Sequence, residues 1–214
     1  MKWIALIALL VLPTLAAACS PVVRGALKRL LYEEPWRDRS QQPARVVAAL
    51  GLAPGDQVAD LGAGGGYFTF RLARAVGKGG HVYAVDVDAS LLAYVAYQAH
   101  RRGLPQVTTV LAPPNDPGLA VASVDVIFLS NVFHHLPDPP AYFRNARRVL
   151  RQGGRVAIVE ASGRGFPKGH ATPPEAIVAA MEAAGFKLLE QHTFLAKQSF
   201  QVFGVVEARL APRP

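Results

Sequence analysis

Residues 58–70 read VADLGAGGGYFTF, and this stretch decides the fold. Its apolar start, residues 58–61, is typical of a buried strand in a parallel sheet. Glycines follow at Gly62, Gly64 and Gly66, and an amphipathic run comes next. The stretch therefore predicts a strand, a glycine turn and a helix. Glycine suits such a turn because it adopts positive φ and lets a ligand approach bare backbone. The first turn of the helix offers free N–H groups to that ligand.

An acidic residue stands at the end of the next predicted strand. The apolar run 81–85 ends at Asp86, about twenty residues after Gly66. An acid at that place and spacing is where the ribose hydroxyls of a nucleoside are held. The dinucleotide fingerprint G-x-G-x-x-G would need a glycine at Tyr67, which disfavours a nicotinamide-dependent oxidoreductase. The pattern present is D-x-G-x-G-x-G, starting at Asp60.

These residues resemble motif I and the second-strand acid of class I S-adenosylmethionine-dependent methyltransferases of the small-molecule type. The resemblance rests on DLGAGGG at 60–66, AVDVD at 84–88 and HHLPDPPAYFRNARRVLRQGGRVAIVE at 134–160, and it covers about residues 42–206. It implies an α/β fold with a Rossmann-like, doubly wound, seven-stranded sheet. That sheet is expected to be mostly parallel, with an antiparallel terminal hairpin.

The resemblance also implies the cofactor, S-adenosyl-L-methionine, and its site. Asp60 would approach the methionine end through water or the amino group, and Asp86 would bind the ribose. The residues implied to bind the cofactor are Asp60, Gly62, Gly64, Gly66, Asp86, Val87, Asn115 and Asn131. A polar side chain near 115–116 would read the adenine ring, although a simple turn role for Asn115 or Asp116 is an equal alternative.

The loop at 130–140 leaves the fourth predicted strand and is expected beside the glycine turn, because ligands bind where strand order reverses. It carries His134 and His135, which are the candidate catalytic residues, since an imidazole can take a proton from a methyl acceptor. Neighbouring side chains point in different directions, so at most one is expected to face the pocket. The alternative is that they cap the loop. No metal site is predicted, because adjacent histidines need further ligands that the sequence does not place nearby.

The sequence therefore predicts an S-adenosylmethionine-dependent methyltransferase with a small-molecule acceptor. Such an enzyme mainly aligns an activated cofactor with a nucleophile and excludes water. Residues 130–133 stand where amino-group methyltransferases of nucleic acids carry a polar residue, two prolines and an aromatic, and the absence of the prolines disfavours nucleobase methylation. Arsenic methylation is disfavoured because Cys19 is the single cysteine. Two alternatives stay open: a non-catalytic S-adenosylmethionine- or nucleotide-binding envelope protein and, less favoured, a nicotinamide-dependent oxidoreductase.

The composition fits one α/β domain. The chain has 214 residues, of which 51% are hydrophobic and 18% charged, so it is long enough and apolar enough for a sizeable core. The formal charge of +8 could indicate nucleic acid or an anionic membrane. The basic residues are scattered, however, which disfavours nucleic acid. No pattern indicates an oligomeric state.

The first twenty residues have the pattern of a signal peptide or membrane anchor. Lys2 precedes the apolar run 3–12, and the small residues 16–18 precede Cys19. This segment resembles the lipobox of bacterial lipoproteins, in which the cysteine is lipidated, although Ala16 stands where leucine is favoured. We expect membrane attachment through the N-terminus, with an envelope lipoprotein favoured.

A cytoplasm-facing signal anchor is the alternative for this segment. Arg24, Lys28 and Arg29 follow the apolar run closely, and positive residues favour the cytoplasmic side. After residues 1–20, the predicted organisation is a connector and cofactor-covering segment at 21–42 and a methyltransferase domain at 43–214.

Overall fold

The computed structural model describes residues 20–32, 37–163 and 169–206. The predicted signal or anchor at 1–20, with Cys19, lies outside the described residues except for Ser20. No helix within the described ranges is both long and apolar enough to cross a membrane.

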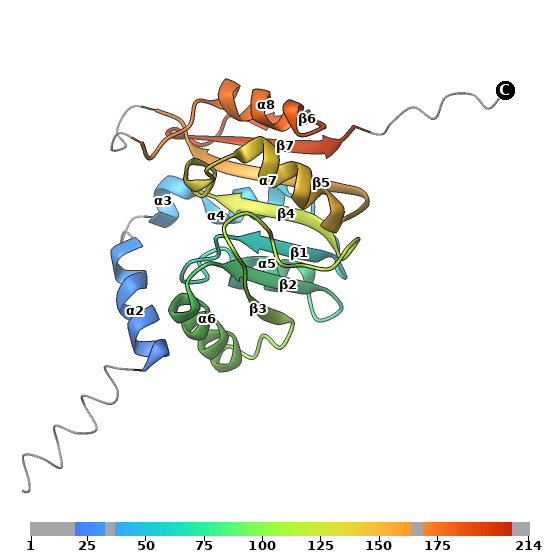
Figure 1. The fold of residues 1–214 in the computed structure, drawn as a ribbon. Coiled ribbons are helices and arrows are strands. Elements are labelled where there is room, and N and C mark those ends of the chain that lie inside the picture. Colours follow the sequence, from blue (N-terminus) through green and yellow to red (C-terminus); the bar gives the residue numbers. More distant parts are fainter. Residues whose placement is uncertain (1–19, 33–36, 164–168, 207–214) are drawn as a thin grey trace, which may run out of the picture.

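Helices and strands alternate along most of the chain (Figure 1). The helices are α2 (Pro21–Tyr32), α3 (Arg37–Gln41), α4 (Pro43–Ala49), α5 (Thr69–Val76), α6 (Ala89–Arg101), α7 (Pro139–Ala146) and α8 (Pro174–Ala183), with 3₁₀ turns η1 (Phe133–His135) and η2 (Arg147–Val149). The strands are β1 (Gln57–Leu61), β2 (His81–Asp86), β3 (Val107–Leu111), β4 (Val124–Ser130), β5 (Leu150–Ala161), β6 (Phe186–His192) and β7 (Gln198–Val205).

The strands form one sheet in the order β3-β2-β1-β4-β5-β7-β6. The first five strands are parallel to their neighbours, whereas β7 runs antiparallel to both β5 and β6. This is the predicted Rossmann-like, doubly wound sheet with an antiparallel terminal hairpin, so the predicted fold class is confirmed. The strand order reverses between β1 and β4, which leaves a crevice at their carboxyl ends.

Both faces of the sheet are buried, which explains why its strands read as continuous apolar runs. Successive residues of a strand point to opposite faces. Val58 of β1 and Val126 of β4 belong to a core that also holds side chains of α4, α5 and α6. Ala59 and Ile127 belong to a second core shared with α7 and α8. Figure 1 shows α7 and α5 on opposite sides of the sheet.

The segment before α4 packs onto the domain through two short helices. In α2, Gly25 lies so close to α6 that a Cβ there would meet the Ser90 carbonyl oxygen at 2.0 Å. Lys28 of α2 forms an ion pair with Asp88, which caps α6. Within the predicted connector and cofactor-covering segment, residues 37–41 form α3, of which Asp38, Arg39 and Ser40 are exposed.

Helix α3 is held in place by an aromatic ring. The Arg37 guanidinium lies 3.9 Å from the centre of the Tyr67 ring, and the Tyr67 hydroxyl donates to Asp38 at 2.6 Å. Arg71 also donates to Asp38, at 2.9 Å. These contacts place α3 over the glycine turn.

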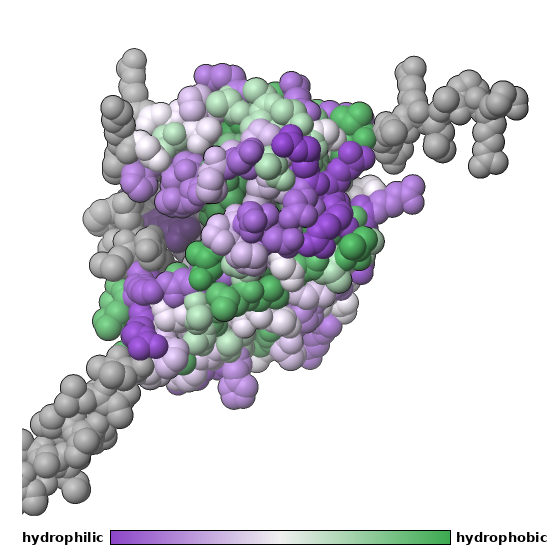
Figure 2. Space-filling view, viewed as in Figure 1, coloured by the Kyte–Doolittle hydropathy of each residue, from purple (hydrophilic) through white to green (hydrophobic). Residues whose placement is uncertain are grey.

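Figure 2 shows a hydrophilic surface, in purple, in the region of α7. Arginines of η2 and β5 follow α7 along the chain. Several of them bind the chain itself. Arg148 donates to both oxygens of Asp116 at 2.8 Å, and Arg151 donates to Asp125 at 2.9 Å. Arg147 donates to the carbonyl oxygen of Val206. These three arginines therefore form hydrogen bonds within the protein, so their charges do not make up a free basic surface.

Candidate functional site

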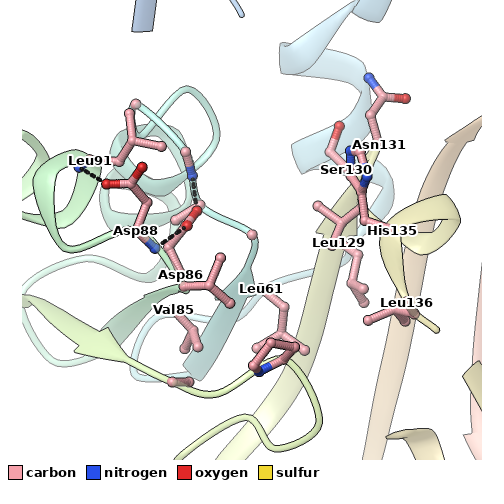
Figure 3. A pocket seen from close by; sticks show the side chains of 18 of the residues that line it. Leu61, Val85, Asp86, Asp88, Leu91, Leu129, Ser130, Asn131, His135 and Leu136 are labelled. Atoms are coloured by element: carbon pink, nitrogen blue, oxygen red, sulfur yellow. Dashed lines mark hydrogen bonds between the residues drawn. The ribbon is translucent and has the colours of Figure 1, made fainter. Parts of the chain in front are cut away.

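A cavity of about 910 Å³ opens at the carboxyl ends of β1, β2 and β4, a volume within the range of small-molecule sites. Figure 3 shows Asp86, the last residue of β2, and Asp88 on one side and Ser130, Asn131 and His135 on the other. The wall consists of Arg37, Ser40, Gln41, Leu61–Gly65, Val85–Asp88, Leu91, Ala112–Pro114, Asp116, Leu129–Val132, His135, Leu136, Tyr142, Lys197 and Gln198. The cavity therefore lies in the crevice where the strand order reverses.

The glycine turn forms one wall with exposed backbone. Gly64 adopts φ +53°, and a Cβ there would meet no other atom closer than 4.0 Å, because its position faces the open cavity. Gly62, at φ +68°, is constrained by packing instead, since a Cβ would lie 2.3 Å from Cγ2 of Val132. The turn thus needs glycine at 62 for contact with the β4 loop and at 64 for a free ligand path.

Asp86 joins this turn to the end of β2. Its Oδ2 accepts the Gly64 N–H at 2.8 Å, and its Oδ1 accepts the Asp88 N–H at 2.9 Å. Each carboxylate oxygen retains capacity for a further hydrogen bond. Val87 lines the same wall with 63% of its surface exposed, so it offers an apolar contact beside the acid.

Asp60 lies behind the cavity wall and does not line it. It is 3% exposed, and its Oδ2 accepts a hydrogen bond from the Thr69 hydroxyl at 2.6 Å. Burial raises the pKa of Asp60 to about 7, the Thr69 hydrogen bond opposes the rise, and the charge of Asp86 adds to it. A buried carboxyl of this kind favours a nearby cation, although its side chain is not among the cavity-lining groups.

Two other predicted residues also lie off the cavity. Gly66 lines a separate hollow with Tyr67, and a Cβ there would lie 2.6 Å from the Phe70 ring. Asn115 is not part of the wall, whereas Asp116 is. The carboxylate of Asp116 is already bound by the Asn145, Arg148 and Gly118 donors that lower its pKa, which suits the turn role better than adenine recognition.

The β4 side of the cavity carries polar groups. Asn131 sits at φ +56°, a left-handed conformation that asparagine tolerates, and its Oδ1 accepts from Gln198 at 2.8 Å. Ser130 Oγ and Gln41 Oε1 are buried wall atoms with no hydrogen-bond partner in the described part of the chain. Buried polar atoms are normally hydrogen-bonded, so these two are unsatisfied groups beside the cavity.

His134 and His135 differ in position, although their ring centroids are 4.0 Å apart. His135 is exposed and lines the cavity. His134 does not line it, and its Nδ1 lies 2.6 Å from Oε1 of the buried Glu160. Burial lowers the pKa of both imidazoles and raises the pKa of Glu160 to about 7.

A third histidine lies beside His134 and His135 in the structure. It supplies a further possible ligand, whose absence near these residues in the sequence was the argument against a metal site. His170, from the loop after β5, lies with its ring centroid 5.5 Å from that of His134 and 6.1 Å from that of His135. The fold therefore supplies a third imidazole that the sequence did not place nearby.

Sequence reasoning missed several residues of this site. Glu160 ends an apolar strand just as Asp86 does, so the same rule applied to β5 would have found it. Arg37 and Gln41 reach the cavity through α3, and Lys197 through the approach to β7. Arg37 and Gln41 lie in the segment at 21–42 that is expected to cover the cofactor pocket, whereas no local pattern marks Lys197.

Comparison with known proteins agrees with this architecture. Residues 59–158 match the family model described as a methyltransferase domain. A crystal structure of a SAM-dependent methyltransferase from Aquifex aeolicus superposes with a TM-score of 0.77 and 24% identity, covering 86% of this chain and 97% of that chain. At this identity the likeness shows the fold.

Curated relatives match a similar segment. An arsenite methyltransferase of Halobacterium salinarum is 35% identical over 107 residues, which are 50% of this chain and 27% of that protein. Nocamycin O-methyltransferase of Saccharothrix syringae is 34% identical over 105 residues, 49% of this chain and 38% of that protein. The matches thus span well under half the length of either relative.

Proposed function

We propose that this protein binds S-adenosylmethionine in the cavity between β1, β2 and β4 and transfers its methyl group to a small-molecule acceptor. The observation that carries the proposal is Asp86. Its carboxylate stands on the cavity wall and holds the Gly64 N–H at 2.8 Å, so the acid and the glycine turn form one surface for a ribose. The match of residues 59–158 to a methyltransferase domain supports this assignment.

The methionine portion fits the opposite part of the wall. Gln41 Oε1 can accept from the cofactor's ammonium group, and the Ser130 hydroxyl can donate to its carboxylate. Both atoms lack a partner among the described residues and are almost fully covered, so their side chains would rotate toward the cavity to make these contacts and would thereby satisfy two polar groups. Burial raises the pKa of Asp60 to about 7, and an ammonium group bound nearby would favour its ionised form.

The methyl acceptor is assigned to the histidine end of the cavity. Methyl transfer from a sulfonium is an in-line displacement, for which alignment and exclusion of water are the main requirements. His135 lines the cavity and is placed to contact the acceptor, whereas His134 is held by Glu160 and positions its neighbour. Alanine at His135 is expected to lower kcat with little change in cofactor affinity.

Calorimetry on the purified full-length protein tests the cofactor assignment. S-adenosylmethionine and S-adenosylhomocysteine should bind, and NADH should not. Asp125→Asn is the matched control for substitution of Asp86. Asp125, like Asp86, accepts a backbone N–H, that of Gln57, but it lies at the opposite end of β1. Binding of NADH in place of the sulfur cofactors would overturn the proposal. Binding without turnover on any acceptor would favour a non-catalytic binding protein.

For the N-terminal segment we propose membrane attachment, with lipidation at Cys19 on an exported protein. The apolar run and the small residues before Cys19 support it. Alkaline phosphatase fused after Pro214 should be active, because this enzyme folds only outside the cytoplasm. Cys19→Ala should abolish lipid attachment. An inactive fusion would instead support the cytoplasm-facing anchor, and anchoring that survives Cys19→Ala would exclude the lipid.

A further inference from the structure

Three of the six histidines of the chain converge beside the cavity. One ring nitrogen from each of His134, His135 and His170 lies within 4.8 Å of the other two. They come from two separate segments, η1 after β4 and the loop after β5. His135 and His170 are exposed, so burial of apolar surface does not explain why the three rings meet.

A buried acid orients the first of these rings. Glu160 is fully buried at the end of β5, and its Oε2 accepts the Phe133 N–H at 2.9 Å. Its Oε1 lies 2.6 Å from Nδ1 of His134. A carboxylate at Nδ1 fixes the tautomer with the proton on that nitrogen and leaves the Nε2 lone pair free. Metal-binding histidines almost always donate their second ring N–H to a carboxylate or carbonyl in this way.

We propose that His134, His135 and His170 bind one divalent transition-metal ion of the zinc class. Zinc binds imidazole nitrogen at about 2.0–2.1 Å in tetrahedral geometry, which places neighbouring ligand atoms about 3.4 Å apart. The present separations, all within 4.8 Å, would need to shorten by up to about 1.4 Å to reach that value. Three imidazoles also select against magnesium and calcium, which prefer oxygen ligands. Three protein ligands leave a fourth position open, as in catalytic zinc sites.

The ion would stand at the acceptor end of the cavity, because His135 also lines the cavity wall. Its role there rests on the proposed methyl transfer. An acceptor hydroxyl bound at the open position loses its proton to solvent more readily, since the cation lowers its pKa. The oxygen lone pair then forms the bond to the methyl carbon as the carbon–sulfur bond breaks, releasing neutral S-adenosylhomocysteine. In this role the histidines act as ligands and not as bases.

Metal binding is tested on untagged, full-length protein that has been treated with a chelator. Calorimetric titration with Zn²⁺ should show one ion per chain, and Co²⁺ should give the visible absorption of a tetrahedral site. His135→Ala and His170→Ala should each weaken binding at least tenfold, and Glu160→Gln about 10- to 100-fold. His100→Ala is the control, because His100 is an exposed histidine of α6 and should leave the affinity unchanged.

The open position is tested with acetohydroxamate, an oxygen ligand that does not require methyl transfer. Its addition should shift the Co²⁺ spectrum of the wild-type protein. Absence of stoichiometric binding, or equal Zn²⁺ affinity in wild type and His170→Ala, would overturn the site. The variants at 135 and 170 replace exposed side chains, so their folding can be verified by circular dichroism. Calorimetry of S-adenosylmethionine with metal-free protein is read separately, so failure of cofactor binding would refute the methyltransferase assignment and leave the metal site standing.

Discussion

Replacement of Asp86 by alanine gives the sharpest test of the cofactor site. The change removes two oxygens that hold the Gly64 and Asp88 N–H groups at 2.8 and 2.9 Å and that would accept the two ribose hydroxyls. Hydrogen bonds to a charged group contribute about 1.5–3 kcal/mol. At about 1.4 kcal/mol per tenfold, the affinity for S-adenosylmethionine should fall roughly 10- to 150-fold.

The assay is isothermal calorimetry on wild type, Asp86→Ala and Asp86→Asn. The asparagine variant keeps the shape and one oxygen, so its affinity should lie between the other two. Asp125→Asn again serves as the control, since it changes an acid that accepts a backbone N–H away from the cavity. An affinity for Asp86→Ala within twofold of wild type, in a protein folded by circular dichroism, would refute the ribose assignment and the reasoning from the β2 acid.

Three other substitutions probe the same region. Gly64→Val should abolish cofactor binding in a folded protein, because its side chain would enter the cavity at φ +53°; normal binding by calorimetry would place the ligand elsewhere. Burial raises the pKa of Asp60 from 3.8 to about 7, so its stabilising contribution is complete below pH 3.8 and is lost as pH rises to about 7. Asp60→Asn should therefore flatten the decline in the free energy of unfolding between pH 5 and 8, measured by urea titration, by about 3 kcal/mol, and an unchanged slope would contradict the assignment. Gly62→Ala should lower the thermal midpoint by the equivalent of about 1–3 kcal/mol, because its Cβ would lie 2.3 Å from Val132; if Val132→Ala restores nothing, backbone strain and not the contact is responsible.

The parts of the site that could be predicted from the sequence are those whose structure is determined by residues close to one another in the chain. Asp86 and the glycine turn follow from strand, turn and helix patterns within 58–86, and the structure places both on the cavity wall. Local pattern also sets the parallel strands, because continuous apolar runs between amphipathic helices have few other arrangements.

Residues whose role depends on packing between distant segments could not be predicted in the same way. The turn at 113–118 contains both Asn115 and Asp116. Arg148 and Asn145, which donate hydrogen bonds to Asp116, decide which of the two faces the cavity. Helix α3 forms because Tyr67 and Arg71 bind it, and its five residues carry no periodic signal. His170 lies in a glycine- and proline-rich segment, where nothing local indicates its neighbours.

The contact between Gly62 and Val132 has a consequence for how such a protein can diversify. It packs the glycine turn directly against Val132 of the β4 loop, so position 62 has no room for a side chain. Substitutions further along, from His134 onward and around His170, alter the opposite rim without displacing the glycine turn. Under the proposed function, selection for a new acceptor would act on the histidine rim while the glycine-turn rim is inherited unchanged, which would make the two halves of the cavity separable in evolution and in engineering.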